Sequence, residues 1–490
     1  MKTAVGFPFP QGCTVEGQTV NFSVAVPEGQ TCELIIYKKG ARASAFSQEM
    51  PYSDVAGNLH FLSVVLEQPE DYEYCYKIGG KIVPDPYGKA FSGREHWSVS
   101  KGKEKRKLRT RIVTDTFDWE KSQFPHLKKE DVIAYSLHVR GFTKHSSSGV
   151  AHKGTFDGVT EKLPYLQKLG INQIHLMPVY EFDENQRHVN YWGYGKAYFF
   201  APKASYAAGD PVNEMKSLVR QMHLAGIEVI LEMPFTEGTT FSLILDCLRY
   251  WVMQYHVDGF IVNPYICNPD ELAKDPVLAK SKILKKEDGF QNVMRRFLKG
   301  DEGMIWDVIC QLKNQDTQLY NYIASHNGFT LCDVVSYDGK HNEANGENNL
   351  DGPDYNYSWN CGAEGTSRKK AVNELRKNQI FNAFFLLLFA QGMPCILSGD
   401  EFMNTQKGNN NAYCQDNLIS WLDWNQLSRQ EELYTFVCRL IALRKACMKQ
   451  TEKIRRHDGQ KRNPSDFLSW GGCVADAGRA CKQTAWCVLS

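Results

Sequence analysis

Short apolar segments alternate with helical stretches between about residues 130 and 446, and this alternation is the feature that most restricts the fold. The strand candidates are residues 132–137, 173–177, 228–231, 259–262, 282–284, 321–324 and 394–397. Helical segments, such as residues 214–225 and 243–255, lie between them. Strands that alternate with helices are typical of an α/β fold with a parallel sheet. Seven strands, with a weaker eighth near Ile305, predict a (β/α)8 (TIM) barrel, in which functional residues follow the carboxyl ends of the strands.

The first 112 residues show a different pattern. Apolar and polar residues alternate over residues 20–26, 59–64 and 72–78, and turns rich in Gly, Pro and Asn separate these segments. Many short strands with period-2 alternation predict a β-sandwich. We therefore expect three regions: a sandwich over 1–112, a barrel over 113–446 and an irregular tail over 447–490.

Composition excludes several classes of protein. The 490 residues contain 57 Lys and Arg against 56 Asp and Glu, a net charge of +1. Proteins that bind nucleic acid or membrane surfaces usually carry a basic excess, so neither partner is expected. No apolar run approaches the ~20 residues needed to span a bilayer. The first eight residues lack the apolar segment of a secretory signal, and 15 scattered cysteines are typical of reduced thiols, so the expected location is cytoplasmic.

Longer motifs follow the predicted strands and carry a resemblance to a known family. They occupy residues 138–143, 177–184, 190–194, 341–349, 356–362, 398–402 and 408–417. Through them the chain resembles the isoamylase and glycogen-debranching branch of glycoside hydrolase family 13, within the alpha-amylase superfamily, from about residue 6 to about 447. The resemblance implies a pullulanase-like α-1,6-glucosidase of glycogen or starch, without metal or cofactor. It also implies that the N-terminal sandwich is similar to a carbohydrate-binding module.

The residues at the family's catalytic positions depart from its pattern. Retaining glycoside hydrolysis needs two carboxylates about 5–5.5 Å apart, and the family adds a third. Here the corresponding positions, after strands four, five and seven, hold Asn263, Lys286 and Asn327. A slip of one residue would place Glu287 at the second position instead. The family's arginine beside the nucleophile is replaced by Ile261.

One wall of the family's cleft is also missing from the sequence. The family inserts a small B domain after strand three, but here only residues 238–241 separate this strand from the next helix. Together these departures predict an inactive or strongly impaired hydrolase, a pseudoenzyme that binds α-glucan or acts as the partner of an active debranching homologue. One alternative is an active O-glycosyl hydrolase that uses relocated carboxylates such as Glu237 and Glu287. Another is a degenerate, truncated product.

Four residues are candidates for sugar binding. The resemblance implies that Tyr194 stacks on a sugar ring and that His326 hydrogen-bonds sugar hydroxyls. Tyr191 and Trp192 are further candidates. Packing is the alternative role for each of the four.

The last 45 residues lose the resemblance. The family's C-terminal β-sandwich is missing, and four cysteines are enriched there. A shifted reading frame is one hypothesis for this tail, and DNA sequencing beyond this point would test it.

Overall fold

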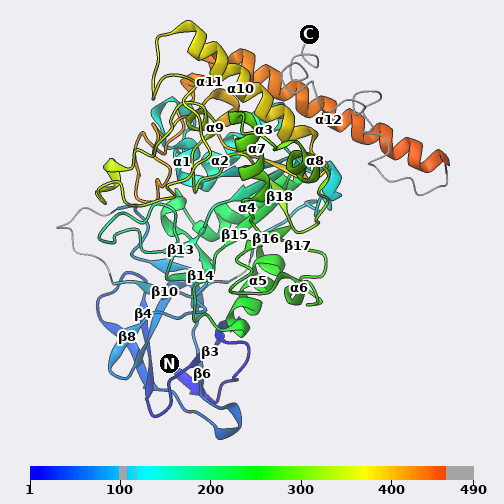
Figure 1. Cartoon of the computed structure of the whole chain (residues 1–490). Helices are drawn as coiled ribbons and strands as arrows, with labels where there is room; N and C mark the ends of the chain where they lie inside the picture. The colour runs from blue at the N-terminus through cyan, green and yellow to red at the C-terminus, as the bar shows by residue number, and fades with distance from the viewer. Residues whose placement is uncertain (99–106, 115, 459–490) are drawn as a thin grey trace.

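An N-terminal β-sandwich precedes a parallel α/β barrel in the computed structural model, which describes residues 1–98, 107–114 and 116–458 (Figure 1). One sheet of the sandwich has the order β1 (Lys2–Ala4), β6 (Leu59–Val65), β3 (Thr19–Ala25) and β2 (Gly12–Glu16). The other has the order β5 (Ser44–Glu49), β4 (Cys32–Lys38), β7 (Tyr72–Ile78), β10 (Arg109–Arg111) and β9 (Phe91–Ser92). Strand β8 (Lys81–Val83) pairs with β7. The expected sandwich is therefore present.

The core of the sandwich follows from the alternation along its strands. Val20, Phe22 and Val24 of β3 are buried between the sheets, and the rings of Phe22 and Tyr74 meet edge to face at 4.8 Å. One carboxylate, Asp85, is fully buried beside this core. It accepts hydrogen bonds from the hydroxyls of Tyr74 (2.6 Å) and Tyr76 (3.3 Å). Burial raises the pKa of Asp85 from 3.8 to about 6, although these bonds oppose the rise.

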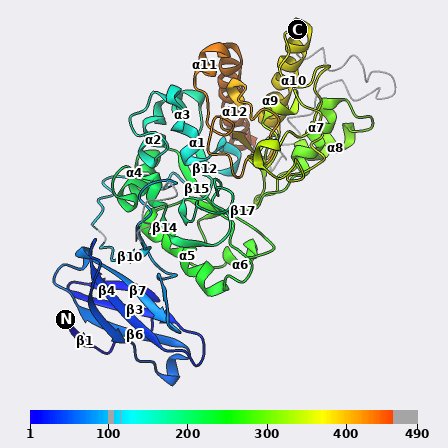
Figure 2. The same cartoon turned by 90° about the vertical axis from the view of Figure 1, so that its left-hand side faces the viewer.

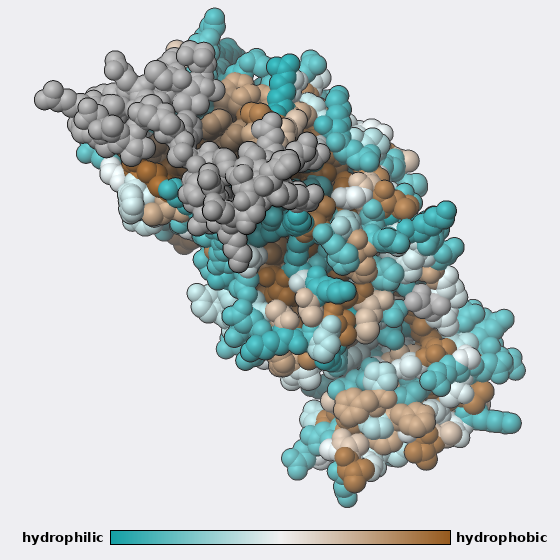
Figure 3. All heavy atoms as spheres, turned by 90° about the vertical axis from the view of Figure 1, so that its right-hand side faces the viewer, coloured by the Kyte–Doolittle hydropathy of each residue, from teal (hydrophilic) through white to brown (hydrophobic). Residues whose placement is uncertain are grey.

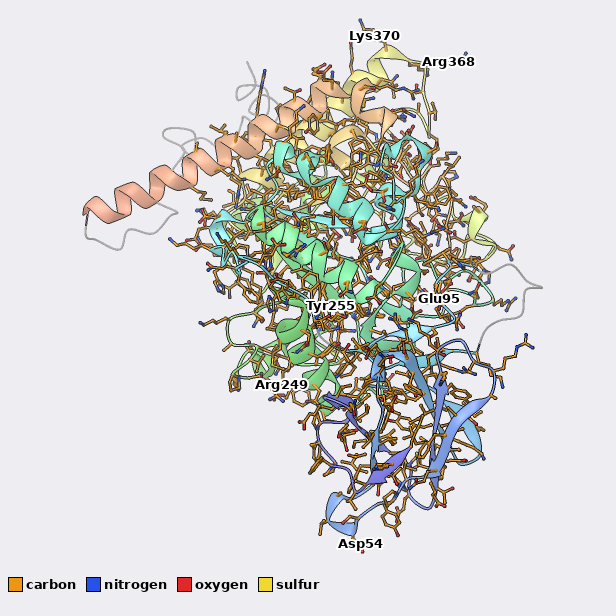
Figure 4. The ribbon with its side chains drawn as sticks, turned by 180° about the vertical axis from the view of Figure 1, so that it is seen from behind. Asp54, Glu95, Arg249, Tyr255, Arg368 and Lys370 are labelled. Carbon is orange, nitrogen blue, oxygen red and sulfur yellow. The ribbon has the colours of Figure 1, made fainter. Side chains whose placement is uncertain are left out.

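This buried carboxyl predicts a specific pH dependence of stability. A raised pKa in the folded state means that stability is highest below about pH 4 and falls as the pH rises through about 6. The difference between the two pKa values corresponds to about 3 kcal/mol. Chemical denaturation between pH 4 and 7 should show wild type losing about this much relative to Asp85→Asn. Asp54→Asn, at the exposed tip of the sandwich in Figure 4, is the control, and a constant Asp85 difference across pH would contradict the expectation.

Seven parallel strands form the barrel. They are β11 (Ala134–Leu137), β12 (Gln173–Leu176), β15 (Glu228–Met233), β16 (Gly259–Val262), β17 (Lys282–Leu284), β18 (Tyr320–Asn321) and β19 (Met393–Leu397). Their order is β17-β16-β15-β12-β11-β19-β18, and an isolated parallel bridge between Lys285 and Leu319 joins the two ends of this row. The predicted barrel of the (β/α)8 type is confirmed.

The predicted eighth strand near Ile305 is wrong. Ile305 begins helix α8 (Ile305–Lys313), which follows α7 (Gly289–Lys299). Met304 and Val308 are buried four residues apart, which is the spacing of one helical face, while Ile305 is exposed. The bridge between Lys285 and Leu319 already joins β17 to β18, so no gap remains for another strand.

Helices surround the barrel. Besides α7 and α8, they are α1 (Val139–Lys144), α2 (Phe156–Glu161), α3 (Leu163–Leu169), α4 (Pro211–Leu224), α5 (Phe241–Tyr255), α6 (Pro269–Leu272), α9 (Leu331–Val334), α10 (Lys370–Phe389), α11 (Asn425–Arg429) and α12 (Glu431–Asp458). Figure 2 shows α10 and α12 at the end of the molecule far from the sandwich. A hairpin of β13 (Tyr180–Phe182) and β14 (Ala197–Pro202) lies on the side of the barrel that faces the sandwich (Figure 1).

Helix α12 extends into the region that the sequence assigned to the irregular tail. Helix α12 continues through Asp458, twelve residues beyond the expected end of the barrel region at 446. Its buried Arg444 donates to the carbonyl oxygens of Leu388, Ala390 and Gly392, which ties the helix to the barrel. Residues 459–490 of the predicted tail lie outside the described residues.

The surface carries polar and apolar residues side by side. On the face shown in Figure 3, hydrophobic residues form scattered groups among hydrophilic ones. Across the described ranges, no helix combines the length and apolar character that a membrane crossing requires. The cysteines within these ranges are free thiols.

Candidate functional site

The three positions matched to the family's carboxylates follow barrel strands, although Asn327 follows the sixth described barrel strand along the chain and not the seventh, because the strand expected near Ile305 is a helix. Asn263 follows β16, Lys286 follows β17 and Asn327 follows β18. Asn263 and Asn327 are exposed, and the side-chain oxygen of Asn263 accepts a hydrogen bond from the Tyr265 amide at 3.0 Å. An amide carries no charge and is a poor nucleophile, so neither Asn can act as the carboxylate of a retaining hydrolase.

Glu232, Tyr194 and His326 form a hydrogen-bonded cluster at the same end of the barrel. The Tyr194 hydroxyl lies 2.7 Å from Oε1 of Glu232 and 2.6 Å from Nε2 of His326. Burial lowers the pKa of His326 well below 6.5, so its ring is neutral at physiological pH. The Tyr194 hydroxyl can therefore donate to Glu232 and accept from Nε2–H of His326. Two predicted sugar-binding residues are thus brought together.

Lys286 adds an amine beside this cluster. Burial lowers the pKa of Lys286, and the nearby Glu232 raises it. Burial likewise raises the pKa of Glu232, and Lys286 opposes that rise. The ammonium also lies 5.4 Å from the centre of the Tyr322 ring. An amine in either protonation state lacks the negative charge with which a family carboxylate would stabilise the oxocarbenium-like transition state.

Glu232 is the member of the cluster that the sequence analysis missed as a site residue. Along β15, Ile230 packs inside the barrel while Leu231 and Met233 pack against the surrounding helices. Side chains alternate along a strand, so Glu232 shares the inward face with Ile230. The inward register of the last residues of this strand was the signal that could have identified it.

Ile261 extends the apolar interior of the barrel up to this site. It is buried with Ile230, Leu284 and Tyr322 in one cluster. An arginine here would hold a neighbouring carboxylate ionised, whereas an isoleucine supplies no charge. Apolar side chains therefore line the barrel interior beneath the cluster of Glu232, Tyr194 and His326.

A buried arginine supports the loop that carries His326. The guanidinium of Arg295 donates to the carbonyl oxygens of Ile323 (2.7 Å), Phe329 (3.2 Å) and Asn356 (3.1 Å). Burial lowers the pKa of Arg295 to about 10, still far above neutrality. The guanidinium is therefore occupied by hydrogen bonds to backbone oxygens, and Arg295 positions the segment between β18 and α9.

Tyr191 and Trp192 are placed differently from Tyr194. Tyr191 is 2% exposed, and its ring stacks on His138 at 4.1 Å. Trp192 is 7% exposed and meets the His326 ring edge to face at 5.1 Å. Their burial favours packing over the predicted contact with sugar, because little of either side chain reaches solvent. Motif matching could not reveal this, because burial depends on the surrounding loops.

The two carboxylates considered as replacements do not join the cluster. Oε1 of Glu287 lies 3.0 Å from Nζ of Lys285 in an ion pair at the surface. Glu237 lines a cavity between the sandwich and the hairpin β13–β14. In the part of the chain that the structure describes, no group of three or more His, Cys, Asp or Glu side chains is placed to hold a metal ion.

Comparison with known proteins agrees with this architecture. The family description "Alpha amylase, catalytic domain" matches residues 129–237. The chain is 31% identical to isoamylase 1 of Arabidopsis thaliana, over 90% of this chain and 75% of the relative. It is 29% identical to the glycogen operon protein GlgX homolog of Mycobacterium tuberculosis, over 98% and 84%.

Solved structures share the fold at lower identity. Pullulanase type I from Bacillus subtilis, complexed with maltose, aligns with a TM-score of 0.70 at 21% identity, over 90% of this chain and 72% of that one. This likeness shows the fold, while the sequence relatives show the family. The chain therefore belongs to the isoamylase and GlgX group of debranching-type proteins in glycoside hydrolase family 13.

Proposed function

We propose that this protein binds α-glucan, such as glycogen, without hydrolysing it at a significant rate. The observation that carries the proposal is the set Asn263, Lys286 and Asn327 at the strand ends where the family places its carboxylates. The hydrogen-bonded cluster beside them supplies one carboxyl group, Glu232, while a double displacement needs a nucleophile and an acid/base. The protein would then act as a glucan-binding subunit, or as a partner of an active debranching homologue in the cytoplasm.

Two features support an α-glucan ligand. The family's solved members include a pullulanase complexed with maltose. The Tyr194 and His326 side chains also place a hydroxyl and an imidazole at the barrel mouth, and such groups suit sugar hydroxyls.

Hydrolysis and binding can be measured separately on the purified protein. We expect glycogen to co-sediment with the protein, while the release of reducing ends stays about 10⁴–10⁶-fold below an isoamylase assayed in parallel. Losses of this size follow when a catalytic residue is removed from a hydrolase. Sustained turnover that disappears in Glu287→Gln would contradict the proposal and favour relocated carboxylates. Failure to unfold cooperatively would instead favour a degenerate product.

A restored variant serves as the control for the catalytic positions. It carries Asn263→Asp, Lys286→Glu and Asn327→Asp together. We expect little rescue of turnover, because Ile261 and the short loop after β15 remain. Full rescue would show that these three substitutions alone abolish catalysis.

A further inference from the structure

The amine of Lys286 lies at the carboxyl end of a barrel strand, the end at which this fold presents its functional groups. Strand β17 ends at Leu284, which packs in the same interior cluster as Tyr322. Side chains alternate along an extended chain, so Lys286 continues the inward side of Leu284. Figure 1 shows β17 beside β16 and then β15, the strand that carries Glu232. The amine therefore belongs to the barrel mouth.

Lys286 differs from its neighbour Lys285 in its bonding. Nζ of Lys285 forms an ion pair with Glu287 at 3.0 Å. Within the described ranges, no hydrogen bond or ion pair joins Nζ of Lys286 to another residue, and the amine lies 5.4 Å from the centre of the Tyr322 ring. The Lys286 side chain is also partly exposed. A ligand at the barrel mouth can therefore reach an amine that no acidic side chain occupies.

The surroundings of Lys286 favour the unprotonated amine. Burial lowers the pKa of Lys286 below 10.5, while the charges of Glu232, Asp288 and Cys395 raise it and that of Arg295 lowers it. His326 also faces this amine, and Lys286 contributes to the lowered pKa of that ring. A lysine with a lowered pKa holds a larger unprotonated fraction at neutral pH, and the unprotonated amine is the nucleophile.

Glu232 and His326 supply a proton carrier and a hydrogen-bond acceptor beside the amine. Oε1 of Glu232 accepts from the Tyr194 hydroxyl at 2.7 Å, while no described residue bonds to Oε2. Burial raises the pKa of Glu232, which favours its protonated form. Nε2 of His326 is bonded to Tyr194 at 2.6 Å, so Nδ1 of the neutral ring keeps a lone pair for a ligand hydroxyl.

We infer that Lys286 forms an imine with small hydroxyaldehydes, with Glu232 as the proton carrier and Nδ1 of His326 as the acceptor for the ligand hydroxyl. The inference does not depend on glucan binding. It assigns a chemical activity to a position where a family carboxylate is absent.

The reaction needs only the amine, the aldehyde and a proton carrier. Nζ of Lys286 bonds to the aldehyde carbon, and the C=O electron pair moves to oxygen, which takes a proton from Glu232. The nitrogen returns a proton to the Glu232 carboxylate, which gives a neutral carbinolamine. The nitrogen lone pair then forms the C=N bond while the C–O bond breaks, and the departing hydroxyl takes the proton from Glu232 and leaves as water. The nitrogen finally loses its last proton to Glu232, so no oxidant or reductant is consumed.

Glycolaldehyde with sodium cyanoborohydride, which reduces the imine to a stable secondary amine, tests this site. Peptide mass spectrometry at pH 7 should show Lys286 labelled about tenfold or more faster than the exposed Lys280, since each unit by which a pKa falls raises the unprotonated fraction about tenfold. Lys129 is the matched comparison, because burial lowers its pKa to about 8 but its Nζ is enclosed. It should be labelled slowly. Labelling of Lys286 no faster than that of Lys280 would overturn the inference.

A second aldehyde tests the class of ligand. Acetaldehyde lacks the hydroxyl of glycolaldehyde and should label Lys286 several-fold more slowly, with both rates taken relative to Lys280. Equal relative rates would overturn the preference for hydroxyaldehydes and the role of His326.

Variants test the part played by Glu232. Glu232→Gln should lower the pH at which labelling of Lys286 is half-maximal, because the charge of Glu232 raises the pKa of this amine. Glu287→Gln changes the pair on the neighbouring Lys285 and should leave that pH unchanged. Equal unfolding midpoints would confirm that both variants fold, and an unchanged pH in Glu232→Gln would contradict the role of Glu232. Failure of wild type to co-sediment with glycogen would contradict the proposed function alone.

Discussion

Replacing Lys203 with Met is expected to lower the free energy of unfolding by about 3–5 kcal/mol. The ammonium of Lys203 is fully buried and lies 2.8 Å from Glu181 and 2.8 Å from Glu184. It also donates to the carbonyl oxygen of Phe182 at 2.9 Å. Removing it leaves two carboxylates in an interior without a compensating charge, which is among the most costly single changes. Urea denaturation followed by tryptophan fluorescence measures the loss.

The same carboxylates provide the control. Lys203→Met/Glu181→Gln/Glu184→Gln should be clearly more stable than Lys203→Met alone, because no unpaired charge remains. Lys77→Met breaks an exposed pair, Lys77 to Glu33 at 3.1 Å, and should change stability by less than about 1 kcal/mol. If the Lys203 and Lys77 substitutions lowered the free energy of unfolding equally, the buried ion pairs would stabilise the fold no more than an exposed pair does.

Replacing Arg444 with Met should also lower the free energy of unfolding by about 3–5 kcal/mol, because three buried carbonyl oxygens would then lack a hydrogen-bond donor. Arg444 is 3% exposed, and its bonds to Leu388 and Ala390 are both 2.6 Å, with a third to Gly392 at 2.9 Å. These oxygens lie at the end of α10 and before β19, so the arginine connects α12 to the barrel. Besides the change in unfolding free energy, hydrogen exchange should become faster in α12.

Arg439 of the same helix supplies the comparison. It is exposed, and Arg439→Met should change stability by about 0.5 kcal/mol or less. If the two arginine variants were equally stable, α12 would not be anchored through Arg444.

Periodicity predicted most of the fold because each strand carries its own local pattern. Apolar runs at residues 228–231 and 259–262 match β15 and β16 within a few residues. Ile305 was assigned wrongly because a short apolar segment is equally compatible with a strand and with a helix face. The bridge between Lys285 and Leu319, which are 34 residues apart, distinguishes the two, because it closes the barrel without a strand near Ile305.

The candidate site was predicted only in part. The sequence placed Asn263, Lys286 and Asn327 at strand ends, since motif order along the chain determines which residue follows which strand. It did not show that Tyr191 is enclosed while Tyr194 reaches Glu232. These side chains are three residues apart, so the difference comes from the loops packed around each of them.

The family, the order of sandwich and barrel, and the residue types at the strand ends could be predicted from sequence alone, because each depends on local patterns and motifs along the chain. The tertiary structure decided the number of strands that pair, the length of α12, and the cluster of Glu232, Tyr194 and His326. These depend on side chains that meet across long stretches of chain, such as Tyr194 and His326, and burial and charge then set their chemistry.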